Sequence, residues 1–76
     1  MATAYILINT EVAAEEEVLE KLKKLPEVKE AHLVYGIYDL IAKVEADTLE
    51  ELKEDVTKHL RSLDKVRSTM TMICVD

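Results

Sequence analysis

Two spacings of hydrophobic residues follow one another along the chain. Strand-like patterns occur over Thr3–Asn9, Val28–Tyr35, Tyr38–Ala46 and Lys65–Val75. The alternation of side chains is clear in the last two and weak in the first. Over Ala13–Leu25, and again from Asp47 to Leu63, apolar residues recur every three or four positions, as on one face of a helix. The pattern therefore predicts strand, helix, strand, strand, helix and strand, in that order.

The first strand is apolar on both of its faces. Ala4, Ile6 and Ile8 lie on one face, and Tyr5 and Leu7 lie on the other. A strand of this kind is buried on both sides. If the helices cover one face, another body must cover the opposite face, and the sheet of a second subunit is the simplest cover.

The ends of the two helices are marked by charge and by capping residues. In the first helix glutamates come early and lysines late, which complements the helix macrodipole, and Pro26 marks the end. Thr48 opens the second helix, with Glu50 and Glu51 placed for a capping box. Its apolar stripe consists of Leu49, Leu52, Val56, Leu60 and Leu63.

Gly36 is the only glycine and lies between the second and third strands. Because a two-residue hairpin turn needs a positive φ, Gly36 and Ile37 are predicted to form that turn. Asp39 soon follows, although aspartate is depleted in strands and needs solvent or a partner. Leu40 begins the row that should face the helices, so we expect Asp39 to point away from them, toward a subunit boundary and a possible ligand.

The order of elements predicts a fold of the α+β class. It is the ferredoxin-like βαββαβ plan, a four-stranded antiparallel sheet with two helices on one face and the first and third strands central. Residues 1–76 form one domain. Because a core of this size rarely contributes more than about 3 to 5 kcal/mol, we expect an oligomer of the dimeric α/β barrel type.

Composition excludes several classes of function. The net charge of −6 has the wrong sign for gripping phosphate backbones, so direct nucleic-acid binding is not expected. A single glycine excludes a glycine-rich phosphate loop. No cysteine and histidine residues have zinc spacing, so neither a metal nor another cofactor is expected. No run approaches about 18 apolar residues and the start lacks a signal sequence, so the expected compartment is the cytoplasm, without membrane association.

Several side chains have an ordinary structural interpretation beside a functional one. Thr69 and Thr71 share one row of the last strand, where threonine is common, yet two hydroxyls could also bind a carboxylate or amide. His59 and His32 are interpreted as surface residues, with no acid expected beside His32. Cys74 is interpreted as a small buried hydrophobe. We therefore expect no enzyme activity.

One combination of motifs is more specific. It comprises Pro26-x-Val28, then Val34-x-Gly36-x-Tyr38-Asp39-Leu40, then Asp47-Thr48-Leu49-x-x-Leu52, and a closing Thr69-x-Thr71. Over essentially its whole length the chain resembles the effector-binding (RAM) domain of the Lrp/AsnC family of feast/famine regulators. The Gly-x-Tyr-Asp hairpin is the most specific part of this resemblance.

The resemblance implies an amino-acid-sensing domain of transcription regulators. Dimers would form by facing sheets, four dimers would form an octameric ring, and the effector would bind between dimers. The implied effector-binding residues are Gly36, Tyr38, Asp39, Leu40, Thr69 and Thr71. Asp39 would meet the amino group of the effector, whereas Ile37 stands where many members carry an acid.

The family's transcription factors carry an N-terminal helix-turn-helix, whereas here Met1 is followed at once by the first strand. We therefore expect a stand-alone domain that acts by assembling with a full-length regulator. Three alternatives share the predicted fold: a cofactor-independent enzyme of the dimeric α/β barrel type, an ACT-like amino-acid-binding module, and a pure oligomerisation module.

Overall fold

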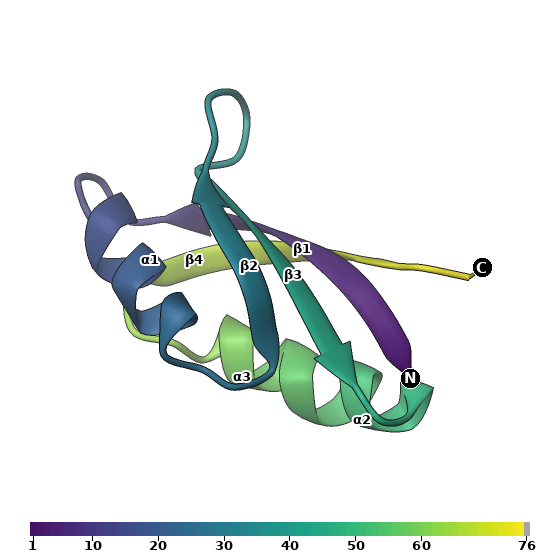
Figure 1. Ribbon diagram of the computed structural model, residues 1–76. Coiled ribbons are helices and arrows are strands. Elements are labelled where there is room, and N and C mark those ends of the chain that lie inside the picture. The colour runs from purple at the N-terminus through teal and green to yellow at the C-terminus, as the bar shows by residue number, and fades with distance from the viewer. Residues whose placement is uncertain (76) are drawn as a thin grey trace.

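The computed structural model describes residues 1–75 and contains the predicted order of elements (Figure 1). The strands are β1 (Ala2–Thr10), β2 (Val28–Leu33), β3 (Leu40–Ala46) and β4 (Val66–Ile73). The first helix is α1 (Glu15–Lys23), and the second helical segment consists of α2 (Leu49–Glu51), a wide π turn η1 (Leu52–Val56) and α3 (Thr57–Arg61).

The four strands form one antiparallel sheet in the order β2-β3-β1-β4. The first and third strands are therefore central, as predicted. Figure 1 shows α1 and the second helical segment together on one side of the curved sheet. The ferredoxin-like βαββαβ prediction is confirmed.

The helix side of the sheet contains the core. Its strand residues alternate strictly along β1 and β3, and α1 and the second helical segment add the remaining apolar side chains. Residues of both central strands are fully buried: Ala4, Ile6, Ile8, Leu40, Ala42 and Val44. The helices contribute Val18, Leu22, Leu52, Val56 and Leu60.

The opposite side, here called the open face, has no covering element within residues 1–75. Register places Leu7 of β1 between Ile41 of β3 and Met70 of β4, and it places Tyr5 beside Met72. Tyr5 is 37% exposed, Met70 49% and Met72 46%. The predicted burial of β1 on both sides is thus achieved on the helix side alone within this chain.

The second helix was expected to be a regular α-helix, but its centre forms a π turn. Both the N–H and the Oγ1 of Thr57 donate to the carbonyl of Leu52, the hydroxyl at 2.9 Å. Leu52, Val56 and Leu60 are spaced by four, so on a regular helix of about 3.6 residues per turn this stripe would drift by about 80°. The extra residue of the wide turn offsets that drift, which lets both leucines reach the core.

Two helix limits differ from the prediction. The first helix begins at Glu15 instead of Ala13, because Ala13 has φ of 65° and lies outside the helix, and it ends at Lys23, with Lys24 as its C-cap. Thr48 caps the second helix as predicted, accepting a hydrogen bond from the N–H of Glu51 at 3.0 Å. Leu49, however, is 47% exposed, because it lies in the first turn, before the helix reaches the sheet.

The hairpin between β2 and β3 is longer than the predicted two-residue turn. The N–H of Val34 donates to the carbonyl of Asp39 at 3.0 Å, so residues 35–38 form the loop. Asp39 is held on its other side, where its N–H donates to the carbonyl of Ile8 at 3.0 Å. Because Asp39 is fixed to β1, the chain turns farther out, and the loop stands clear of the body (Figure 1).

No helix within residues 1–75 is long and apolar enough to cross a membrane. In the same residues, no three histidine, cysteine or acidic side chains are grouped so that they could hold a metal ion.

Candidate functional site

The hairpin loop has a backbone conformation that suits glycine. Gly36 has φ of +152°, and nothing lies within 4 Å of the place where a Cβ would be. Glycine is therefore required by the backbone itself and not by crowding. The bare backbone of Gly36 also leaves the adjoining surface open to a ligand.

Asp39 is anchored to the end of β1. Its Oδ2 accepts a hydrogen bond from the N–H of Thr10 at 2.9 Å and another from the Thr10 hydroxyl at 3.4 Å. Thr10 is buried and continues the helix-side row of Ile8. The carboxylate thus folds back onto β1, which differs from the prediction that it points away from that row. Its hydrogen bonds within residues 1–75 use Oδ2 alone, which fixes the orientation of the side chain.

A hollow of about 290 Å³ lies beside the hairpin. Its lining consists of Glu15, Leu33, Val34, Tyr35, Gly36 and Asp39. Two of the predicted site residues, Gly36 and Asp39, therefore meet at one surface. Sequence reasoning missed Glu15, which reaches the hollow from the first turn of α1. The early glutamates were visible in the sequence, but only the packing of α1 beside β2 shows which of them lies at the hairpin.

The other predicted site residues lie elsewhere. The hydroxyl of Tyr38 donates to the sulfur of Met70 at 3.6 Å, which places Tyr38 against the open face. Leu40 is fully buried in the core, so its side chain is not at the surface. Thr69 and Thr71 pair with Ile8 and Ile6 across the β1–β4 ladder, and they therefore belong to the helix-side row. Within one chain, the structure brings together only part of the predicted set.

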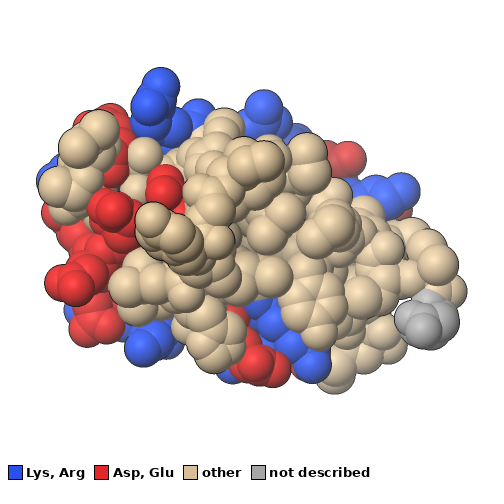
Figure 2. Space-filling view, turned by 90° about the horizontal axis from the view of Figure 1, so that it is seen from above, with Lys and Arg blue, Asp and Glu red and all other residues tan. Residues whose placement is uncertain are grey.

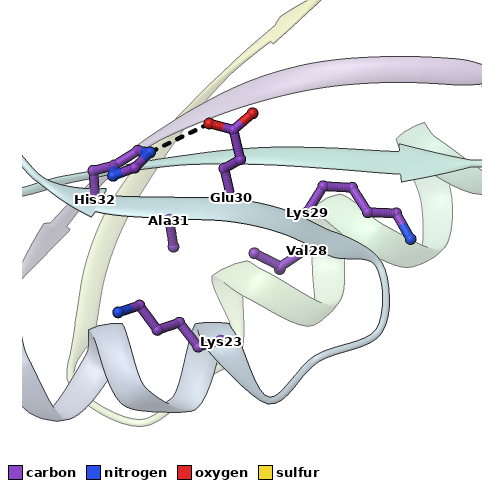
Figure 3. A pocket seen from close by; sticks show the side chains of 6 residues that line it. All are labelled: Lys23, Val28, Lys29, Glu30, Ala31 and His32. Carbon is purple, nitrogen blue, oxygen red and sulfur yellow. Dashed lines mark hydrogen bonds and ion pairs between the residues drawn. The ribbon is translucent and has the colours of Figure 1, made fainter.

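A larger hollow, of about 410 Å³, lies along the free edge of β2 (Figure 3). Lys23 borders it from α1, and the remaining lining residues are Val28, Lys29, Glu30, Ala31 and His32. Figure 3 shows Ala31 and Val28 directed toward the helices and Glu30 and His32 on the other side of the strand. None of the predicted effector-binding residues lines this hollow.

Both histidines are exposed and each contacts a glutamate. His59 Nδ1 lies 3.1 Å from Glu27 Oε1, and His32 Nε2 lies 3.3 Å from Glu30 Oε1. The expectation that His32 has no acid beside it is wrong, because residues two apart on a strand share a face. Cys74 is exposed, contrary to the predicted burial, because it follows the last residue of the edge strand β4.

Charge is unevenly spread over the surface. Figure 2, seen from above the sheet, shows acidic side chains gathered at the α1 end of the molecule and a largely uncharged area across its middle. The open-face residues Tyr5, Met70 and Met72 are the exposed large apolar side chains of β1 and β4. The molecule therefore has one acidic end, next to the hairpin, and an open face whose middle is largely uncharged, with Lys43 of β3 paired beside Tyr5.

Comparison with known proteins identifies the architecture. The sequence profile of the Lrp/AsnC ligand binding domain matches residues 3–76. An uncharacterized HTH-type transcriptional regulator of Pyrococcus horikoshii is 39% identical over 74 residues, which are 93% of this chain and 49% of that protein. The chain thus spans about half the length of this curated relative.

Two solved structures are similar over nearly the whole chain. The crystal structure of FFRP-DM1 has a TM-score of 0.92 and 51% identity, covering 99% of this chain and all of that one. The crystal structure of the hypothetical protein PHS023 from Pyrococcus horikoshii has a TM-score of 0.89 and 51% identity, covering 99% of this chain and 90% of that one. These matches favour the Lrp/AsnC interpretation over the ACT-like alternative. The chain belongs to the Lrp/AsnC ligand-binding domain family.

Proposed function

We propose that this domain senses amino acids as a homo-oligomer and acts on transcription through partner regulators instead of contacting DNA. Family membership supports a regulatory, ligand-binding role. The relative from Pyrococcus horikoshii is an HTH-type transcriptional regulator. The net charge of −6 opposes direct binding to a phosphate backbone and so favours action through protein partners.

The hollow beside the hairpin is the observation that carries the sensing role. Its volume of about 290 Å³ lies at the lower limit of the roughly 300 to 1,000 Å³ typical of ligand pockets, which suits a molecule of amino-acid size. Asp39 presents a carboxylate whose orientation is fixed by Thr10, and a fixed carboxylate is a good partner for an α-ammonium group. Gly36 adds a backbone with no side chain in the way.

The open face carries the assembly part of the proposal. A second copy laid against Tyr5, Leu7, Ile41, Met70 and Met72 would remove the exposed apolar surface of β1 and β4 from water. Further association of dimers, up to an octamer of four dimers, would bring other surfaces to the hairpin. Because Thr69 and Thr71 do not line the hollow within one chain, we propose that a neighbouring subunit supplies them.

Native mass spectrometry with each common amino acid present would test both parts, since it reports subunit number and bound ligand together. Calorimetry would then compare the protein with an Asp39→Asn variant. Asparagine can still accept from the N–H of Thr10 but lacks the charge, so we expect binding to weaken about tenfold or more while the fold is kept. Asp55→Asn, which changes an exposed helix residue, is the matched control.

The outcomes separate the two parts of the proposal. A well-folded oligomer that binds no amino acid would exclude the sensing role and leave assembly alone. A protein that stays monomeric at micromolar concentration would exclude the open face as a dimer interface. Equal binding by the Asp39→Asn variant would show that the effector does not bind at the hairpin.

A further inference from the structure

We propose that the hollow beside the hairpin prefers ligands with an extra positive charge, namely dibasic amino acids or alkyl diamines, and that Glu15 binds the second ammonium group. This inference rests on the proposed sensing function and specifies its ligand class. It assigns a role to Glu15, a residue that lies in a different element from the hairpin.

The first argument is the charge of the lining. Two of the six lining residues, Glu15 and Asp39, are carboxylates, and none of the six is cationic. No ion pair within residues 1–75 involves either of them, whereas nearby Glu17 is paired with Lys21 and Lys65. The two acidic residues that line the hollow therefore have no cationic partner within residues 1–75, and the charge of each is available to a ligand.

The second argument is the placement of the two groups. Asp39 enters from the base of the hairpin and is fixed by Thr10, whereas Glu15 enters from the first turn of α1 and is half-buried. An ordinary amino acid needs only one carboxylate for its α-ammonium group. A ligand with a second ammonium, separated by an alkyl chain, would satisfy both acids at once.

The third argument is the apolar part of the lining. Leu33, Val34 and Tyr35 supply the remaining side chains, and all three are exposed within one chain. Methylene groups between two ammonium groups would cover this apolar surface. An acidic ligand would find the same surface but would meet two carboxylates of its own sign.

The helix macrodipole offers a simpler reason for a glutamate at position 15, and the experiment must separate the two. Acids are favoured in the first turn of any helix, and Glu16 occupies the same turn but is exposed and does not line the hollow. Glu16→Gln therefore changes the net charge and the helix terminus in the same way as Glu15→Gln. It leaves the lining of the hollow unchanged.

The test is calorimetric titration of the oligomeric protein with L-lysine and with L-norleucine, which has the same carbon chain without the ε-ammonium. We expect lysine to bind about tenfold more tightly. Glu15→Gln should reduce that ratio to near one, and Glu16→Gln should preserve it. Cadaverine, which is lysine without its carboxylate, tests whether the ligand is an amino acid or a diamine: weaker binding than lysine supports the amino acid, and equal binding supports the diamine.

Norleucine binding as tightly as lysine, or an unchanged ratio in Glu15→Gln, would overturn this inference while leaving amino-acid sensing intact. Binding of none of the three probes or of any common amino acid would instead overturn the proposed function itself. A ratio reduced equally by both glutamine variants would show that the preference comes from the general acidity of this end and would exclude contact with Glu15.

Discussion

The two faces of the same sheet differ in how completely the chain itself buries them. On the helix side, Ile6 and Ile8 of β1 are fully buried beneath α1 and the second helical segment. On the open face, Tyr5, which directly precedes Ile6 in the same strand, is 37% exposed. One face is covered by the chain's own helices, whereas no element within residues 1–75 covers the other. If the proposed assembly holds, alternate residues of a single strand govern folding and assembly.

The largest effect is expected on the helix side. Ile6→Ala would leave a cavity at a fully buried position of the central strand and should lower the free energy of unfolding by about 2 to 5 kcal/mol. Because a core of this size contributes only about 3 to 5 kcal/mol, the variant should be largely unfolded as a monomer. Urea denaturation followed by circular dichroism would measure this, with Val12→Ala, at an exposed loop position, as the control. A loss below about 1 kcal/mol would contradict the assignment of the core.

A substitution on the open face should leave the fold intact and weaken dimerisation instead. Met72→Lys places a charge at a side chain that is 46% exposed in one chain, so the fold should persist, but dimerisation would bury an unpaired charge. We expect the dissociation constant of the dimer to rise about a hundredfold, measured by analytical ultracentrifugation. Leu49→Lys is a close match, because Leu49 is 47% exposed and lies in α2, away from the open face. Equal weakening by both variants would show that the interface is elsewhere.

The hairpin links the two faces, because Asp39 contacts Thr10 of the helix-side row and Tyr38 contacts Met70 of the open face. Gly36→Ala should destabilise the fold by about 1 to 3 kcal/mol, since alanine rarely adopts φ of +152°. No atom lies close enough to clash, so the cost should come from the backbone alone. A Gly36→Asn variant, measured in the same urea titrations, should lose about as much, because asparagine tolerates positive φ mainly in the left-handed helical region and not at +152°. Equal stability of wild type and Gly36→Ala would show that the loop relaxes freely.

Much of the fold could be predicted because local patterns and global packing agree. The alternating rows of β1 and β3 indicated the buried face directly, and Thr48 marked the start of the second helix. The π turn was not predicted. Apolar residues spaced by four drift around a regular helix, and the wide turn, with its two hydrogen bonds from Thr57 to Leu52, offsets this drift. The need for that correction arises only when the helix packs against the sheet.

The site was less predictable than the fold. Gly36 and Asp39 are close in sequence, so their proximity followed from the hairpin. The contact of Asp39 with Thr10 joins residues that are 29 positions apart in the chain. The hollow brings Glu15 beside residues that lie 18 to 24 positions farther along, from Leu33 to Asp39. The register of β1 against β3 and the start of α1 determine these contacts. Neither the register nor the helix start could be fixed to within one residue from the pattern alone.

The smallest effect on stability is expected from a surface contact on the helix side. Lys65, in the turn before β4, donates to Oε1 of Glu17 at 2.9 Å, and Lys21 lies 3.3 Å from Oε2 of the same glutamate. Lys65, and to a lesser extent Lys21, lowers the pKa of Glu17 below its ordinary value of 4.5, while Glu17 raises the pKa of Lys65 above 10.5. A lowered carboxyl pKa stabilises the fold above about pH 4.5, and this contribution is lost as the pH falls through the folded-state value.

Lys65 contributes to the stability of the fold at the other end of the pH range. Its raised pKa stabilises the fold below about pH 10.5, and that contribution is lost as the pH rises through the folded-state value. Glu17→Gln should therefore be slightly less stable than wild type between about pH 5 and 10, and the two curves should converge at both extremes. Thermal unfolding across this range, at low and high salt, would measure the difference. Because these groups are solvent-exposed, high salt should shrink it, and a difference that persists below pH 3 would show that Glu17 acts through packing and not through its charge.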